Sequence, residues 1–244
     1  MRTGDIIERV RSLYTRGVPS YDCRLTPRHI YNKMLSARSF LLSRKYSGKS
    51  QVSEWDYQTL DCIAMVDSTL SECGCFGVNQ CVRRSRCELP KPLYTGKGDM
   101  IRSVSTINGQ VLLSQDTWVS KKYGGGAKYT ADAPSYMFKD KHLYVFGLPR
   151  LKVATMIAVF EDPLKVDEFN HSDCSECYNP EEDTDMCMSA LDIDFPIEES
   201  MVEPLVDMCV RELVAMFNLA IQDVYNNRED NSQTDRRNNE KLGE

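Results

Sequence analysis

The residues best spaced for chemistry are one histidine and three cysteines. They follow the pattern His-x2-Cys-x2-Cys-x9-Cys, at His171, Cys174, Cys177 and Cys187. Three thiolates and one imidazole complete the tetrahedron that structural zinc prefers. The second Cys-x2-Cys that would make a zinc assignment specific is absent, so free thiols are the alternative interpretation. A second cysteine cluster contains only a Cys-x-Cys and fits zinc less well, at Cys73, Cys75, Cys81 and Cys87.

Residues for catalysis are scarce. The chain has three histidines, at positions 29, 142 and 171, and it contains no nucleophile elbow, HExxH motif or dinucleotide fingerprint. The stretch GGGAK at 124–128 lacks the first spaced glycine and the Lys-Ser/Thr pair of a P-loop. We therefore expect a protein that is not an enzyme and has no cofactor, with zinc as the only candidate metal.

Three helices are predicted from periodic apolar residues, over 3–16, 26–46 and 202–226. The last has the broadest apolar face, which includes Val206, Val210, Leu213, Phe217, Ala220 and Val224. Thr3 is expected to cap the first helix, and Thr26-Pro27 to begin the second. A single helix cannot hide so wide an apolar face, so we expect the three helices to pack together.

The second predicted helix carries a basic face opposite its apolar one. Its members are Arg28, Lys33, Arg38, Arg44 and Lys45. The favoured interpretation of such a row is a helix surface that faces solvent.

The middle of the chain has β patterns. Leu60, Cys62, Ala64 and Val66 alternate, which favours a strand, with a helix as the weaker alternative. Asn108-Gly109 predicts a two-residue hairpin turn in which Val104 faces Leu113 and Thr106 faces Val111. A second hairpin is expected around Asp140-Lys141, followed by a buried strand over 151–160.

Composition places limits on the compartment and the class of protein. The chain has 244 residues, a net charge of −6 and ten cysteines. The N-terminus has no apolar run of the kind found in signal peptides. No apolar stretch in the sequence is long enough for a membrane span. We therefore expect no membrane partner, and a reducing compartment in which cysteines are thiols or metal ligands rather than disulfides.

These patterns together predict an α+β fold. N- and C-terminal helices pack in one layer, formed by residues 1–50 and 200–226, with an inserted antiparallel β region at 51–165. An acidic irregular loop covers 166–199. A polar C-terminal tail covers 227–244.

Several stretches resemble a known family. The opening MRTGDIIERVRSLYTRGVPSYDCRLTPRHIYNKMLSARSFLLSRKY, the segments LPKPL at 89–93 and LYVFGLPRLKVATMIAVFEDP at 143–163, and the closing amphipathic helix resemble virion ring proteins of crAss-like bacteriophages. Such proteins are similar in role to the head-to-tail connectors of short-tailed phages. The resemblance implies a connector-like helical layer and a structural ring of twelve copies in the phage neck.

The implied partners are the portal protein above the ring, adjacent neck or tail ring proteins, and genomic DNA passing through the channel. The expected location is the virion, after assembly in the host cytoplasm. In such a ring Arg28, Lys33 and Arg38 become candidates for contacts with acidic groups of a neighbouring subunit. A zinc-stabilised module that binds nucleic acid or protein is the alternative function.

Overall fold

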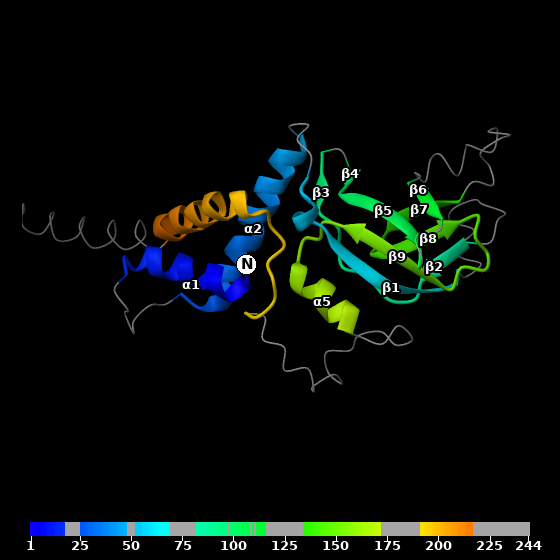
Figure 1. Ribbon diagram of the computed structural model, residues 1–244, viewed down its shortest axis with the longest axis horizontal. Helices are drawn as coiled ribbons and strands as arrows, with labels where there is room; N and C mark the ends of the chain where they lie inside the picture. The colour runs from blue at the N-terminus through cyan, green and yellow to red at the C-terminus, as the bar shows by residue number, and fades with distance from the viewer. Residues whose placement is uncertain are drawn as a thin grey trace, which may run out of the picture.

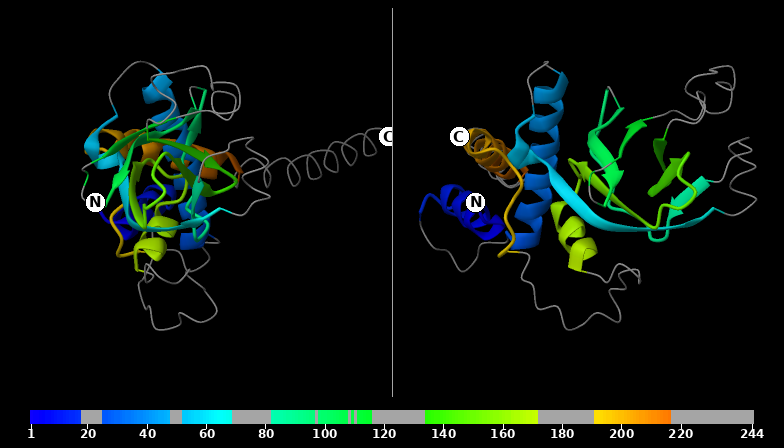
Figure 2. Two further views of the ribbon diagram at one scale, coloured as in Figure 1. Left: turned by 90° about the vertical axis from the view of Figure 1, so that its right-hand side faces the viewer. Right: turned by 45° about the vertical axis from the view of Figure 1, so that its right-hand side comes forward.

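The computed structural model describes residues 1–17, 25–47, 52–68, 82–96, 98–107, 109, 111–115, 134–171 and 191–216. A group of helices and a β-barrel lie side by side along the long axis (Figure 1). Helix α2 (Pro27–Ser47) stands between them, with α1 (Thr3–Tyr14) and the C-terminal helix, residues 199–216, on its other side (Figure 2).

The helices share one apolar core. It includes Ile6 and Val10 of α1, Ile30 and Met34 of α2, and Val202, Leu205, Cys209 and Leu213 of the C-terminal helix. The predicted packing of the three helices is confirmed as far as residue 216. Phe217 and the rest of the apolar face to Val224 lie outside the described residues, as does the tail at 227–244.

Thr26 begins α2 as predicted, because its Oγ1 accepts a hydrogen bond from the backbone N–H of His29 at 3.2 Å. The predicted cap at Thr3 is wrong. Thr3 lies inside α1, and its hydroxyl donates to the carbonyl oxygen of Ile193 at 2.8 Å. At Gly4 an added Cβ would lie 2.9 Å from the carbonyl oxygen of Leu191, so only glycine allows this close approach. Thr3 thus joins the N-terminus to the segment 191–198.

The barrel has seven strands in the order β1-β2-β8-β7-β6-β5-β9. Their bounds are Gln58–Asp67 (β1), Val82–Ser85 (β2), Ile101–Thr106 (β5), Leu112–Gln115 (β6), Ser135–Lys139 (β7), His142–Phe146 (β8) and Val153–Ala158 (β9). A small separate hairpin joins β3 (Tyr94–Thr95) to β4 (Gly98–Asp99). Side chains fill the barrel interior, including Leu60, Val104, Leu143 and Met156.

The fold class predicted from the sequence is wrong. The strands form a closed barrel rather than an inserted antiparallel region beside a connector-like helical layer. One pair, β6 and β7, is parallel, with Ser114 opposite Ser135. A parallel pair needs a long connection, and residues 116–133 supply one in the sequence. Closure also removes the exposed strand edges that an open sheet would present.

The two predicted hairpins are confirmed. Val104 lies opposite Leu113, and the N–H of Thr106 donates to the carbonyl oxygen of Val111 at 3.1 Å. In the second hairpin Phe138 lies opposite Leu143, and Asp140 and Lys141 have φ values of 50° and 61°. Positive φ values at Asp140 and Lys141 agree with the predicted two-residue turn of the second hairpin. In the first turn Gly109 has a φ of 64°, and Asn108 lies outside the described residues.

Strand β1 exists, but its buried face differs from the predicted alternation. Leu60, Ile63 and Met65 are buried, whereas Cys62, Ala64 and Val66 are only partly so. The pairing of β1 with β9 shifts between Leu60 and Ile63. This irregularity inserts an extra residue, which moves every later side chain to the opposite face.

Helix α5 (Pro163–His171) follows the barrel and was not predicted, since the sequence placed most of its residues in an irregular acidic loop. The amide of Asn170 donates to the carbonyl oxygen of Thr59 at 2.8 Å, and Val166 packs into the barrel core. Asp162, just before the helix, accepts hydrogen bonds from the Leu164 N–H and the Tyr31 hydroxyl. The helix is therefore attached to both the barrel and α2.

A buried arginine joins the helices to the barrel. Arg38 of α2 is fully buried and donates to the carbonyl oxygens of Pro196 at 2.9 Å, Phe160 at 2.8 Å and Asp56 at 3.4 Å. Its guanidinium also lies 5.8 Å from the ring centre of Phe195, within cation–π range. Burial lowers the pKa of Arg38 to about 10, so the group stays charged at neutral pH.

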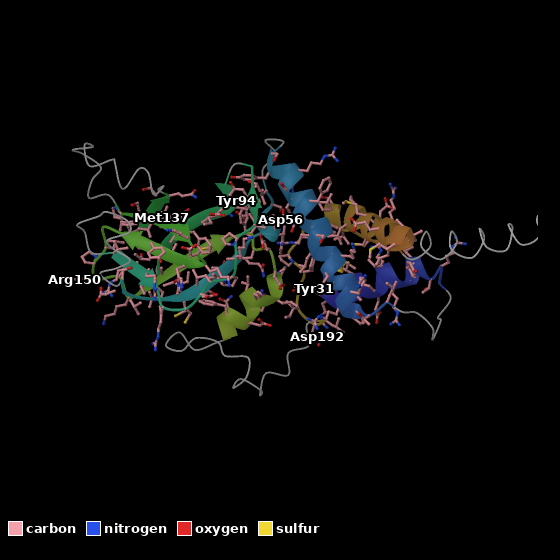
Figure 3. All side chains as sticks on the ribbon, turned by 180° about the vertical axis from the view of Figure 1, so that it is seen from behind. Tyr31, Asp56, Tyr94, Met137, Arg150 and Asp192 are labelled. Atoms are coloured by element: carbon pink, nitrogen blue, oxygen red, sulfur yellow. The ribbon has the colours of Figure 1, made fainter. Side chains whose placement is uncertain are left out.

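The carboxylate of Asp56 is the anionic partner at this junction (Figure 3). Its two oxygens accept from the N–H groups of Glu198 at 2.8 Å and Ser53 at 3.2 Å. Lys45 approaches it at 3.6 Å and also pairs with Glu198. A buried charge network thus holds α2, the start of β1 and the segment before the C-terminal helix together.

Replacing Arg38 with alanine should lower the free energy of unfolding by about 3–5 kcal/mol, because three buried carbonyl oxygens lose their donor and the buried carboxylate of Asp56 keeps only Lys45 as a nearby cation. The matched control is Arg28→Ala on the same helix, where the side chain is exposed and the cost should stay within about 0.5 kcal/mol. Urea denaturation followed by circular dichroism measures both. Equal midpoints for the two variants would contradict a structural role for Arg38.

Candidate functional site

The predicted zinc site falls mostly outside the structure. Cys174, Cys177 and Cys187 lie beyond the described residues, and of His171 only the backbone is described, at the end of α5. In the described ranges no three His, Cys, Asp or Glu side chains gather to hold a metal. The zinc hypothesis therefore stays a prediction.

The cysteines that the structure describes have structural surroundings. Cys62 and Cys87 are in disulfide bonds, so the expectation of thiols is wrong for these two. Cys209 is a free thiol within the helical core. Burial raises the pKa of Cys209 to about 12, and the charge of Glu212 adds to this effect. A thiol with such a pKa is a poor nucleophile at neutral pH.

The basic face of α2 is not one surface. Arg28 is exposed, whereas the ammonium group of Lys33 contacts Glu212 of the same chain at 3.2 Å. Arg38 is wrong as an interface candidate, because its guanidinium is buried among backbone carbonyls. The sequence could not show this, since the elements that cover Arg38 come from distant parts of the chain.

An open groove of about 920 Å³, here named the Trp55 groove, is a candidate binding surface. The N-terminus, the short η1 helix (Glu54–Asp56) and the segment before the C-terminal helix form its walls. Its apolar lining residues are Met1, Trp55, Phe195, Pro196, Ile197 and Val202. Charged side chains also line it, among them the ion-paired Arg9 and Glu203. Phe195, Ile197 and Val202 are buried, so Met1 and Trp55 supply the exposed apolar surface of the groove. Exposed apolar side chains among charged neighbours are typical of a protein-binding surface.

Trp55 is held open to solvent by its neighbours. A capping box between Ser53 and Asp56 sets the η1 turn, and the buried carboxylate of Asp56 anchors it. The indole between these anchors remains 78 % exposed. A large aromatic side chain on a rigid turn loses little conformational entropy on binding, which is why Trp is common at interface hot spots.

Sequence reasoning missed this groove. The available signal was a tryptophan between two acidic residues, in a turn that begins with the Ser-x-x-Asp spacing of a capping box. The apolar wall comes from residues 195–202, far along the chain, and no local pattern connects it to Trp55.

Within the described residues, no helix has the length and apolar character needed to cross a membrane.

The chain matches the family described as phage tail ring protein 2 over residues 5–233. It is also similar to "Ring protein 2" of Bacteroides phage crAss001, with 28% identity over 209 residues, covering 80% of this chain and 83% of that protein. The resemblance to virion ring proteins of crAss-like bacteriophages is confirmed, and the chain belongs to the phage tail ring protein 2 family.

Proposed function

We propose that this chain is a structural subunit of a ring in the phage neck, below the portal, where it joins capsid to tail. Membership of a ring protein family supports the oligomeric part of this proposal. The observation that carries it in the structure is the Trp55 groove, where the exposed side chains of Trp55 and Met1 lie beside the buried apolar residues Phe195, Ile197 and Val202.

A ring of identical copies needs two different surfaces that fit each other, since its contacts are head-to-tail. The Trp55 groove supplies one apolar surface. Another lies at the barrel end away from the helices, at the β5–β6 hairpin (Figure 1), where Ile107 and Leu112 are 58 % and 70 % exposed. Leu13, Phe40 and Tyr94 are also exposed, but Trp55 at 78 % and Leu112 at 70 % are the most exposed large apolar side chains of the described residues. This exposure supports a contact between the groove and a neighbouring copy.

In this proposal the genome passes through the central channel enclosed by the ring and not through the barrel of any one subunit. The barrel interior is a packed core of side chains, as small barrels are. Twelve copies around an axis, the number implied by the family resemblance, would leave a central channel. The net charge of −6 favours a channel that repels DNA and lets it slide.

The remaining parts of the proposal concern partners and place. We expect contacts with the portal, with adjacent neck or tail rings and, in passing, with genomic DNA, in a particle assembled in the host cytoplasm. Arg28 remains a candidate for contact with an acidic neighbour, and Lys33 would have to exchange Glu212 for such a partner. The domain boundaries predicted from the sequence also remain proposals.

Trp55→Ser should raise the protein concentration needed for half-maximal ring assembly at least tenfold. Aromatic residues at interface hot spots contribute about 2 kcal/mol or more to binding. Its melting temperature should stay near that of the wild type, since the indole is exposed. Phe40→Ser is the matched control, an aromatic side chain 55 % exposed on α2 and outside the groove. Mass photometry and negative-stain microscopy count the rings. Undiminished rings from Trp55→Ser would remove the groove from the interface.

Deletion of residues 227–244 should change the free energy of unfolding by no more than about 0.5 kcal/mol, because this segment is made of charges and amides with one aliphatic residue, Leu242. Docking on the portal should weaken, since repeated weak tails gain strength through effective concentration. A melting curve and co-sedimentation with portal rings measure the two effects. Normal portal binding by the truncated protein would show that the tail has no part in docking.

A further inference from the structure

A second groove, of about 640 Å³, gathers positive charge on a protein whose net charge is negative. It lies between the end of β2, the residues that follow it to Lys91, the β7–β8 turn and α5. Its cationic side chains are Arg84, Arg86, Lys91, Lys141 and Lys165. We name it the basic groove.

The basic groove keeps an excess of cations, because its five cationic side chains face two lining carboxylates, Glu88 and Glu168. Glu88 accepts from Lys141 at 2.8 Å, and Lys91 contacts Glu161 at 2.7 Å. Arg86 and Lys165 are exposed and form no salt bridge with any described residue. An apolar lining from Leu89, Pro90 and Phe169 lies beside these charges. The groove is therefore suited to an acidic polypeptide that also carries apolar side chains.

The chain itself contains such a polypeptide. Residues 172–190 hold six carboxylates and no lysine or arginine, at Asp173, Glu176, Glu181, Glu182, Asp183 and Asp185. Tyr178, Met186 and Met188 in the same segment supply apolar groups. A segment of this length can extend up to about 60 Å, so a loop attached at both ends still reaches an adjacent molecule.

We propose that the basic groove binds the acidic segment 172–190 of a neighbouring copy of this chain. The inference rests on the proposed ring, whose head-to-tail contacts bring different surfaces of two copies together. Each exposed ion pair is weak alone. Several pairs at each contact, repeated around a closed ring, add up and select the correct partner surface.

The test uses two variants of the full chain with opposite charge changes. Arg86→Glu with Lys165→Glu reverses the groove, and Glu181→Lys with Glu182→Lys reverses the segment. Each should raise the protein concentration needed for half-maximal ring assembly about tenfold or more, because like charges then meet across the contact. Higher salt should weaken the wild-type ring and reduce the difference between variants.

Mixing the two variants gives the decisive result. An alternating ring pairs every reversed groove with a reversed segment and every normal groove with a normal segment, so the mixture should assemble near the wild-type concentration. Recovery only when all four changes are in one chain would show that the segment binds its own groove, and would overturn the contact between copies.

Arg150→Glu with Lys152→Glu is the matched control, because it changes the net charge equally at exposed positions that do not line the groove. Arg150 lies at the barrel end remote from the helices (Figure 3). This variant should assemble as the wild type does, and all variants should keep the wild-type melting temperature. Assembly lost equally in the control would overturn the assignment to the groove.

A last experiment uses labelled duplex DNA to test whether the basic groove binds nucleic acid instead. Binding measured by fluorescence anisotropy should not depend on Arg86 and Lys165. DNA binding abolished by the groove reversal, with rings unchanged, would overturn the inference in favour of a nucleic-acid surface. Wild-type protein that stays monomeric would overturn both proposals, whereas unchanged rings from the groove variant overturn this inference alone.

Discussion

The structure depends on one buried cation. Arg38 donates to carbonyl oxygens from the segment before the C-terminal helix, the end of the barrel and the η1 turn, so three parts of the chain meet at a single side chain. A buried guanidinium is costly unless its donors are satisfied, and here nearby carbonyls and the charge of Asp56 offset that cost. Because Asp56 also binds the N–H of Glu198, the same network sets the direction in which the C-terminal helix begins.

This junction has consequences for the surface. Asp56 is buried, and its neighbour Trp55 is exposed, beside the residues from Phe195 to Val202. The wall of the groove is therefore held by the same contacts that attach the helices to the barrel. A surface already fixed by buried contacts loses little entropy on binding, which suits a subunit that must meet its neighbours in one orientation.

Positive charge gathers in the basic groove, whereas negative charge gathers in the segment 172–190, and opposite charges of this kind suit assembly of a ring. The basic groove lies on a protein with a net charge of −6, and a segment without a single lysine or arginine follows α5. Apolar and electrostatic surfaces contribute differently to an interface: the first supplies most of the affinity, and the second selects partner and register. A ring subunit benefits from both, because it must close with the correct neighbours and reject other orientations.

Features that depend on near neighbours could be predicted from the amino-acid sequence. These are the registers of two hairpins, the start of α2 at Thr26-Pro27 and the apolar core of the helices. Barrel closure, the shifted register in β1, the burial of Arg38 and the Trp55 groove depend on contacts between distant segments and could not be predicted in this way. The acceptors of Arg38 at Pro196 and Phe160 lie 158 and 122 residues away, and the groove joins Trp55 to residues beyond 190. A basic row on a helix looks the same whether solvent or a barrel covers it, because burial is set by contacts between distant segments.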